Sequence, residues 1–397
     1  MILAEIPVMR FGQILKIIEG VIKAITPSIK NWKRKEDEMQ IIPIIKVTGT
    51  FCNLRCRYCY YHQENQGRKT IMTFETLERI IQEMLNNSTK TVHFIWHGGE
   101  PLLVGLNFYK QLLRFQKKHQ KGHSIVNKIQ TNATLLTSQW VDFLEENSFN
   151  IGVSCDGPKE FHDAYRLSGN NGGSFDNVMR GIKLLQRKNV YPHAITVITK
   201  DKINHAKKIY DFFFNNNISF DPKPCYEVDS LTKKIADFSV TPNEYAEFMV
   251  EMFNFWIKTD NPKFKIRNLE NILIGLLGGR PYLCEFNGEC KKFLTINING
   301  DVGPCDSFPL KIKFGNLLQE SWPSILSGEG YAKYLDCINK ARENCKKCEW
   351  SAVCKGGCLR YSYDSVKSRW TKNIFCQMKK RLFNHITKSL YGKKNNK

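Results

Sequence analysis

Six apolar runs alternate with amphipathic stretches between residues 41 and 225, and this alternation restricts the fold more than any other feature. The runs predict strands at Ile41–Val47, Val92–Trp96, Val126–Gln130, Ile151–Ser154, Ala194–Thr199 and Ile218–Lys223. The stretches near 73–86, 106–119, 137–147, 174–188 and 203–216 repeat their apolar residues at helical spacing. Six strand–helix units favour a parallel sheet with right-handed crossovers. We therefore expect an α/β fold whose reactive residues lie at the carboxyl ends of the strands.

Three cysteines, Cys52, Cys56 and Cys59, follow the first predicted strand in one short loop. Three thiolates can bind three irons of a cubane cluster, whereas a fully ligated four-iron cluster takes four cysteines. No fourth cysteine lies nearby in the sequence, so one iron is left open for a chelating ligand. A zinc site is the alternative, but zinc requires a fourth protein ligand.

The C-x3-C-x2-C spacing, with aromatic Tyr58 before the third cysteine, resembles the signature of the radical S-adenosylmethionine (SAM) superfamily. The resemblance implies that SAM fills the open iron site through its amino and carboxylate groups. It also implies that the cluster reductively cleaves SAM to a 5′-deoxyadenosyl radical. In this superfamily six strand–helix units form an open, partial (β/α)6 barrel, which we expect over residues 41–230.

Gly98, Gly99 and Glu100 follow the second predicted strand. Paired glycines let the backbone approach a ligand closely, although a Gly-Gly-Glu sequence alone also fits an ordinary turn. Its position after the cysteine loop resembles the superfamily motif that receives the amino group of SAM. We expect Glu100 either to accept a hydrogen bond from that ammonium group or to buttress the loop.

Asn132, Ser154 and Arg166 complete the expected SAM site. Asn132 ends the third predicted strand and Ser154 ends the fourth. By resemblance, Ser154 and Arg166 bind the SAM carboxylate, for which a guanidinium group is well suited. A surface salt bridge is the alternative for Arg166.

Eight further cysteines lie in the C-terminal part, enough for two fully ligated four-iron clusters. Their spacing resembles the SPASM domain of radical SAM enzymes that modify peptides and proteins; a pair of zinc ribbons is the alternative. The resemblance implies one auxiliary cluster on Cys284, Cys290, Cys305 and Cys358, and a second on Cys345, Cys348, Cys354 and Cys376. Three [4Fe-4S] clusters are therefore expected in all.

Asp306 directly follows Cys305. In the anaerobic sulfatase-maturating enzymes, which this chain resembles from about residue 42 to 378, an aspartate at that position acts as the base on the substrate side chain. One residue departs from that group: His97 stands before Gly98, where sulfatase maturases carry glutamine. A histidine there is more similar to SPASM maturases of ribosomal peptides, including cyclophane-forming enzymes.

The remaining sequence sets the expected organisation of 397 residues. We expect an N-terminal helical extension (1–40), the radical SAM core (41–230), a helical connection (231–280), the SPASM domain (281–378) and a basic tail (379–397). No signal peptide and no membrane span are visible, so the fourteen cysteines indicate a reduced, cytoplasmic protein. The net charge of +21 is spread along the chain without an arginine stripe, and nucleic acid is not an expected partner.

These features together predict an oxidoreductase that removes hydrogen from a side chain of a peptide. The favoured hypothesis is a carbon–carbon crosslink in a ribosomally made precursor peptide. The alternative is oxidation of a Cys or Ser of a sulfatase to formylglycine. Either reaction requires an electron donor, such as flavodoxin or ferredoxin. A non-catalytic iron–sulfur protein is disfavoured by the open three-cysteine site.

Overall fold

The computed structural model describes residues 41–392 apart from 62–68, 70, 89, 229–231, 233 and 260. The expected extension over 1–40 and residues 393–397 lie outside this range. Contacts divide the chain into two units. Among the described residues, the sheet unit comprises 41–196 with 289–340, and the helical unit comprises 197–288 with 341–392.

A mainly parallel sheet organises the sheet unit. Its strands are β1 (Ile42–Lys46), β2 (Thr91–His97), β3 (Ser124–Thr131), β4 (Asn150–Ser154), β5 (His193–Ile198), β7 (Phe293–Ile296), β8 (Asp301–Pro304) and β9 (Gly315–Asn316). Their order is β5-β4-β3-β2-β1-β7-β8-β9, parallel as far as β7 and antiparallel beyond it. Lys46 pairs with His97 across β1 and β2. The predicted α/β fold is confirmed, and residues expected in the C-terminal domain extend the sheet beside β1.

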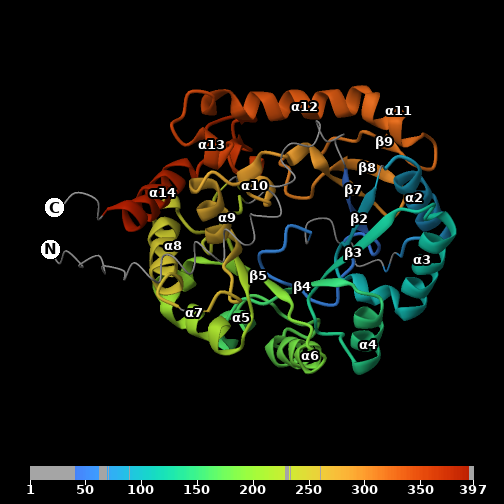
Figure 1. Ribbon diagram of the computed structural model, residues 1–397, viewed down its shortest axis with the longest axis horizontal. Helices are drawn as coiled ribbons and strands as arrows, with labels where there is room; N and C mark the ends of the chain where they lie inside the picture. The colour runs from blue at the N-terminus through green and yellow to red at the C-terminus, as the bar shows by residue number, and fades with distance from the viewer. Residues whose placement is uncertain are drawn as a thin grey trace. The chain divides into compact units, whose positions relative to one another are not determined.

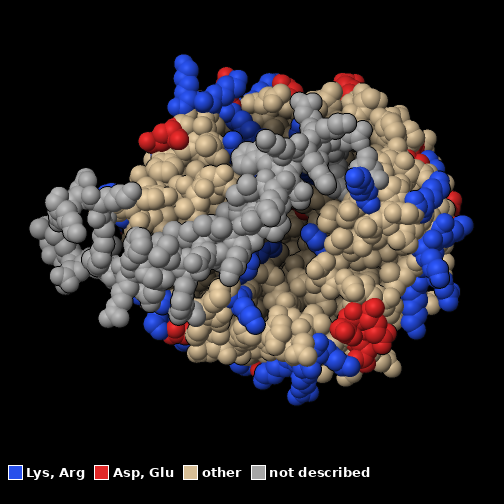
Figure 2. All heavy atoms as spheres, in the orientation of Figure 1, with Lys and Arg blue, Asp and Glu red and all other residues tan. Residues whose placement is uncertain are grey.

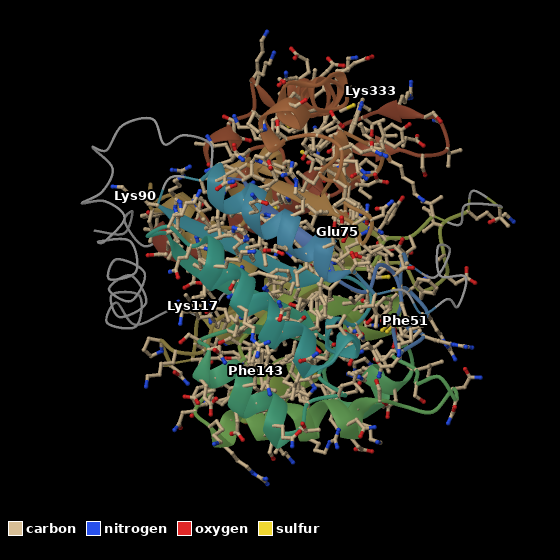
Figure 3. All side chains as sticks on the ribbon, turned by 90° about the vertical axis from the view of Figure 1, so that its right-hand side faces the viewer. Phe51, Glu75, Lys90, Lys117, Phe143 and Lys333 are labelled. Atoms are coloured by element: carbon tan, nitrogen blue, oxygen red, sulfur yellow. The ribbon has the colours of Figure 1, made fainter. Side chains whose placement is uncertain are left out.

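Helices follow the strands of the sheet unit as the sequence predicts. They are α2 (Phe74–Asn86), α3 (Leu106–His119), α4 (Ser138–Glu146), α5 (Lys159–Asp163), α6 (Phe175–Arg187), α11 (Trp322–Ser327) and α12 (Glu329–Arg342), the last ending just inside the helical unit. In Figure 1, α2, α3, α4 and α6 lie outside strands β2 to β4. Figure 3 shows α2 and α3 side by side, with Glu75 and Lys117 labelled on them. Thr73 and Thr137 cap α2 and α4 by accepting backbone hydrogen bonds, which fixes where these helices begin.

The helical unit continues from the end of β5. It contains β6 (Phe220–Pro224), α7 (Ala206–Asn215), α8 (Pro242–Trp256), α9 (Arg267–Leu276), α10 (Cys284–Asn287), α13 (Ser351–Cys354) and α14 (Cys376–Tyr391). Part of the segment expected as a basic tail is therefore helical. Residues Met378, Leu382, Phe383 and Ile386 of α14 are buried, and His385 contacts Asn254 of α8 at 2.8 Å. The sequence signal was an apolar repeat at helical spacing, which the high lysine content obscured.

Short elements complete the structure. They are the 3₁₀ helices Pro101–Val104, Lys200–His205, Cys290–Lys292, Glu343–Cys345 and Leu359–Ser362, and the strand pair Tyr363–Asp364 and Arg369–Trp370. No described helix is both long enough and apolar enough to cross a membrane. Figure 2 shows Lys and Arg side chains spread over the visible face rather than gathered in one stripe.

Candidate functional site

The cysteine loop begins where β1 ends and rests directly on the Gly-Gly-Glu segment that follows β2. The Gly99 amide donates to the Gly49 carbonyl at 2.9 Å, and the Glu100 amide donates to the Phe51 carbonyl at 3.0 Å. A Cβ atom on Gly99 would lie 2.0 Å from that Phe51 oxygen, which is an impossible contact. Gly98 has φ +116°, a conformation that side chains disfavour. Both glycines are therefore needed to seat the loop; Phe51 is labelled in Figure 3.

The three cysteines of this loop are all partly buried. Backbone amides of Arg55 and Arg57 donate to carbonyls of 167 and 165, which fixes the opposite side of the loop. Burial raises the pKa of Cys52 to about 12 and that of Cys56 to about 11, and the neighbouring thiols contribute in the same direction. Such thiols ionise only when a positive group binds them, because burial penalises uncompensated charge. Three soft donors in this environment fit an iron–sulfur cluster.

Glu100 is fully buried beneath the loop and holds its neighbours in place. Its Oε1 accepts from the Leu102 amide at 3.0 Å and the Thr131 hydroxyl at 2.7 Å, and its Oε2 accepts from the Asn132 amide at 2.7 Å. Burial raises the pKa of Glu100 to about 7 despite these donors. Three of about four acceptor positions on the carboxylate are occupied, so buttressing is the role that these contacts support.

Asn132 joins the end of β3 to the cysteine loop. Its Nδ2 donates to Asn53 Oδ1 at 2.9 Å and lies 3.7 Å from Cys52 Sγ. Its Oδ1 accepts from the amide and the hydroxyl of Thr134 at 3.0 and 2.7 Å. Through these contacts Asn132 holds the cysteine loop against the end of β3. Ser154, at the end of β4, accepts from Gln130 Nε2 at 3.3 Å.

Arg166 lies in a buried cluster of charge beside Cys56. Its Nε is 3.1 Å from Asp156 Oδ1, and its guanidinium lies 5.5 Å from the centre of the Tyr58 ring. The Tyr58 hydroxyl donates to Asp156 Oδ2 at 2.6 Å. Arg166 also lowers the pKa of Cys56, in opposition to burial, the larger effect. The surface salt bridge considered from sequence is wrong, because the Arg166 side chain is 8% exposed.

Asp306 contacts two side chains, one at the end of β1 and one just after the cysteine loop. Lys46 Nζ is 2.5 Å from Asp306 Oδ1, and the Tyr61 hydroxyl donates to Asp306 Oδ2. Lys46 also lies 4.8 Å from the centre of the Tyr61 ring. Burial lowers the pKa of His97, an effect that Lys46 reinforces and Asp306 opposes. The structure thus groups Asp306 and His97 with two residues that sequence reasoning missed.

The missed residues had detectable signals in the sequence. Lys46 is a charged residue at the end of an apolar strand, and Tyr61 is the second of two tyrosines directly after Cys59. Asp156 follows the fourth strand, and its burial with Arg166 is the kind of charge pair that sites use. Each signal is a polar residue at a strand end, where the reactive side chains of such sheets gather.

In the helical unit the structure brings together one of the two predicted auxiliary sets. Burial raises the pKa of Cys345, and Cys354, Cys376 and Cys348 are its next largest influences. Gly356 and Gly357 have φ values of 89° and 75°, and a Cβ on Gly356 would lie 3.5 Å from Cys345 Sγ. These left-handed residues turn the chain tightly between the cysteines.

The other predicted set draws on both units. Cys284 and Cys358 belong to the helical unit, whereas Cys290 and Cys305 belong to the sheet unit, so their grouping stays a prediction. In the described part of the chain, no group of three or more His, Cys, Asp or Glu is arranged to hold a single metal ion. Four-iron clusters differ from such a site, since each cysteine binds a different iron.

Sequence comparisons agree with this geometry. Residues 47–213 match the radical SAM superfamily, and residues 284–349 match the SPASM iron–sulfur cluster-binding domain. A cysteine-type anaerobic sulfatase-maturating enzyme of Clostridium novyi is 33% identical over 358 residues, covering 88% of this chain and 96% of that protein. A serine-type enzyme of Bacteroides thetaiotaomicron is 33% identical over 370 residues, covering 86% and 88%.

Solved structures of such enzymes are also similar to this chain. The enzyme anSMEcpe, with bound AdoMet and a Cp18Cys peptide, matches with a TM-score of 0.81 and 31% identity, over 88% of this chain and 98% of that one. SuiB of Streptococcus suis, with bound S-adenosylmethionine, has a TM-score of 0.60 and 17% identity over 89% and 81%, which bears on the fold alone. Fold and site define a radical SAM enzyme with a C-terminal SPASM domain. The chain belongs to the family of the anaerobic sulfatase-maturating enzymes, and it is a maturase that acts on a peptide or protein.

Proposed function

We propose that this enzyme oxidises a Cys or Ser side chain of a sulfatase to formylglycine. The observation that carries the proposal is Asp306, which Lys46 and Tyr61 fix in the same unit as the cysteine loop. A fixed negative charge at this position stabilises the proton that such an oxidation releases. The cysteine-type and serine-type names of the relatives support this choice of substrate.

The cofactor assignments belong to this proposal. Cys52, Cys56 and Cys59 hold the cluster with an open iron, while Gly98, Gly99, Ser154 and Arg166 contact SAM. When bound, this pair supplies the radical chemistry that removes hydrogen from an unactivated carbon. Around it, Glu100 and Asn132 keep the loop rigid through the contacts described above.

Electron transfer is assigned to the eight C-terminal cysteines. We assign two auxiliary [4Fe-4S] clusters to them, three clusters in all, with flavodoxin or ferredoxin as the external donor. We also keep the expectation of a cytoplasmic protein, since the fourteen described cysteines, seven in each unit, form no disulfide with one another. Reduced thiols are typical of that compartment.

Mass spectrometry of the reaction product tests this function. The reconstituted enzyme, SAM and a reductant are incubated with a sulfatase-derived peptide that carries either Cys or Ser. Formylglycine from Ser loses two hydrogens; from Cys, sulfur is also replaced by oxygen. The aldehyde reacts with a hydrazine reagent, and backbone fragmentation stays complete. An unmodified peptide, with 5′-deoxyadenosine still produced, would contradict sulfatase maturation.

A second candidate is the crosslink predicted from the sequence, and His97 is the observation that favours it. His97 pairs with Lys46 across β1 and β2, within electrostatic range of Asp306, at the position where sulfatase maturases carry glutamine. A crosslinked peptide loses two hydrogens, does not react with hydrazine, and lacks fragments within the ring. The same experiment with short aromatic-rich peptides therefore separates the two reactions.

A further inference from the structure

His97 and Lys46 occupy equivalent positions on neighbouring strands. Each is the last residue of its strand, and the register of β1 and β2 places them opposite one another. Paired residues of parallel strands project to the same face of the sheet. Asp306 reaches Lys46 from the turn after β8. His97, Lys46 and Asp306 therefore form one group at the carboxyl edge of the sheet.

The His97 imidazole has a buried ring nitrogen, Nδ1, that makes no hydrogen bond with the described residues. A buried polar atom without a partner costs free energy, so it calls for an explanation. The titratable groups that face His97 are Asp306 and Lys46, and Tyr61 is linked to them through Asp306. A neutral imidazole here carries one N–H and one free lone pair.

Both carboxylate oxygens of Asp306 already have partners. Its Oδ1 is paired with the Lys46 ammonium, and its Oδ2 accepts from Tyr61. The negative charge of Asp306 favours a protonated imidazole beside it, in opposition to burial, which is the larger effect on the pKa of His97. The arrangement suits Asp306 to stabilise an imidazolium on His97.

We infer that His97 accepts the proton released by the substrate side chain, with Asp306 positioned by Lys46 and Tyr61 to stabilise the imidazolium. This inference rests on the proposed function. For a Cys or Ser substrate, one electron from the external donor would break the C5′–S bond of SAM, and the deoxyadenosyl group so released would take one hydrogen atom from Cβ. The S–H or O–H proton passes to His97. The remaining electron goes to an oxidised auxiliary four-iron cluster, and a double bond forms between Cβ and sulfur or oxygen.

The test compares His97→Gln and His97→Ala with a matched control, His93→Gln, which changes another partly buried histidine of β2. The probes are the sulfatase-derived Cys peptide and its Cys→Ala form. We expect His97→Ala to lower product formed per 5′-deoxyadenosine by about 10²-fold, as loss of a positioned base does. Wild-type product should also fall with pH below the usual histidine range, since protonated His97 cannot accept. His97→Gln should show no such step.

Peptide binding to the SAM-loaded, unreduced enzyme gives a readout without turnover. Wild type should bind the Cys peptide more tightly than the Ala peptide, and this preference should vanish as His97 becomes protonated. In His97→Gln, whose Oε1 also accepts, the preference should persist at every pH; in His97→Ala it should be absent. An unchanged product ratio and pH profile in His97→Ala would overturn the inference. Absence of product from wild type itself would instead overturn the proposed function.

Discussion

The two groups of cysteines reach their positions by different routes. Cys52, Cys56 and Cys59 lie within one loop of the sheet unit, whereas the C-terminal cysteines are spread from residue 284 to 376. The loop is held by backbone hydrogen bonds from Gly99 and Glu100 on one side and to 165 and 167 on the other. A sequence-local motif can thus be preorganised by its neighbours before any cluster binds.

The C-terminal group depends instead on turns and helix ends. Cys354 ends α13 and Cys376 begins α14, and three consecutive left-handed residues, Lys355, Gly356 and Gly357, follow Cys354. Positive φ values are tolerated best by glycine. We therefore expect the loop cysteines to lose their arrangement when the Gly98–Glu100 segment beneath them is altered. The C-terminal cysteines should lose theirs when the turn at 355–357 is altered.

The largest effect is expected from removing the loop cysteines. We predict that Cys52→Ala, Cys56→Ala and Cys59→Ala together lower the iron content from about twelve to about eight per chain, because only fully ligated auxiliary clusters remain. Production of 5′-deoxyadenosine should become undetectable. Iron analysis and chromatography of the nucleoside measure the two quantities, and Cys155→Ala, a buried cysteine of the same unit, is the control.

The matching change in the helical unit sharpens the comparison. Replacing Cys345, Cys348, Cys354 and Cys376 by Ala should remove about four irons, while SAM cleavage continues. Loss of SAM cleavage in this variant, with the loop cluster intact by spectroscopy, would contradict the independence of the two groups.

A smaller loss of function is expected from replacing Asp306, because this substitution leaves every cluster in place. Asp306→Asn keeps the shape but removes the charge that pairs with Lys46. Product formed per 5′-deoxyadenosine should fall by about 10²-fold, within the range for positioned acid–base groups. Asp301→Asn is the matched control, since Asp301 starts β8 and pairs with Lys313. Equal product yields in the two variants would remove Asp306 from the reaction.

Gly99→Ala tests the docking surface of the loop itself. The added methyl group would lie 2.0 Å from the Phe51 carbonyl oxygen, so the backbone before Cys52 must move. We expect SAM cleavage to fall about 10-fold or more, as small displacements of reacting groups do. Gly169→Ala is the control, because its φ, like that of Gly99, lies outside the left-handed region and nothing lies within 4 Å of the added atom. A similar loss in both variants would show that contact with the loop is not responsible.

The alternation of strands and helices and the cysteine loop were predictable because both follow from local sequence patterns. Apolar runs such as Val92–Trp96 predict their strands, and β2 covers Thr91–His97. The Lys46–Asp306–Tyr61 contacts were not predictable, because the sequence separates Tyr61 from Asp306 by 245 positions. The burial of α14 was missed for another reason: its lysines mask an apolar face, and only packing on α8 identifies that face.

The smallest effect is expected from Gly356→Ala in the helical unit. Gly356 has φ +89°, and an added Cβ would lie 3.2 Å from Arg342 Cγ and 3.5 Å from Cys345 Sγ. Since the nearest contact is a flexible side chain, backbone strain should dominate at about 1–2 kcal/mol of unfolding free energy. Thermal or denaturant unfolding measures this loss, and SAM cleavage should stay near that of the wild type. Gly99→Ala should instead lower SAM cleavage more than stability, because its added Cβ would meet a carbonyl group of the loop that carries the cysteines. If Gly356→Ala abolished SAM cleavage while Gly99→Ala did not, the contrast between the docked loop and the turn-dependent group would be wrong.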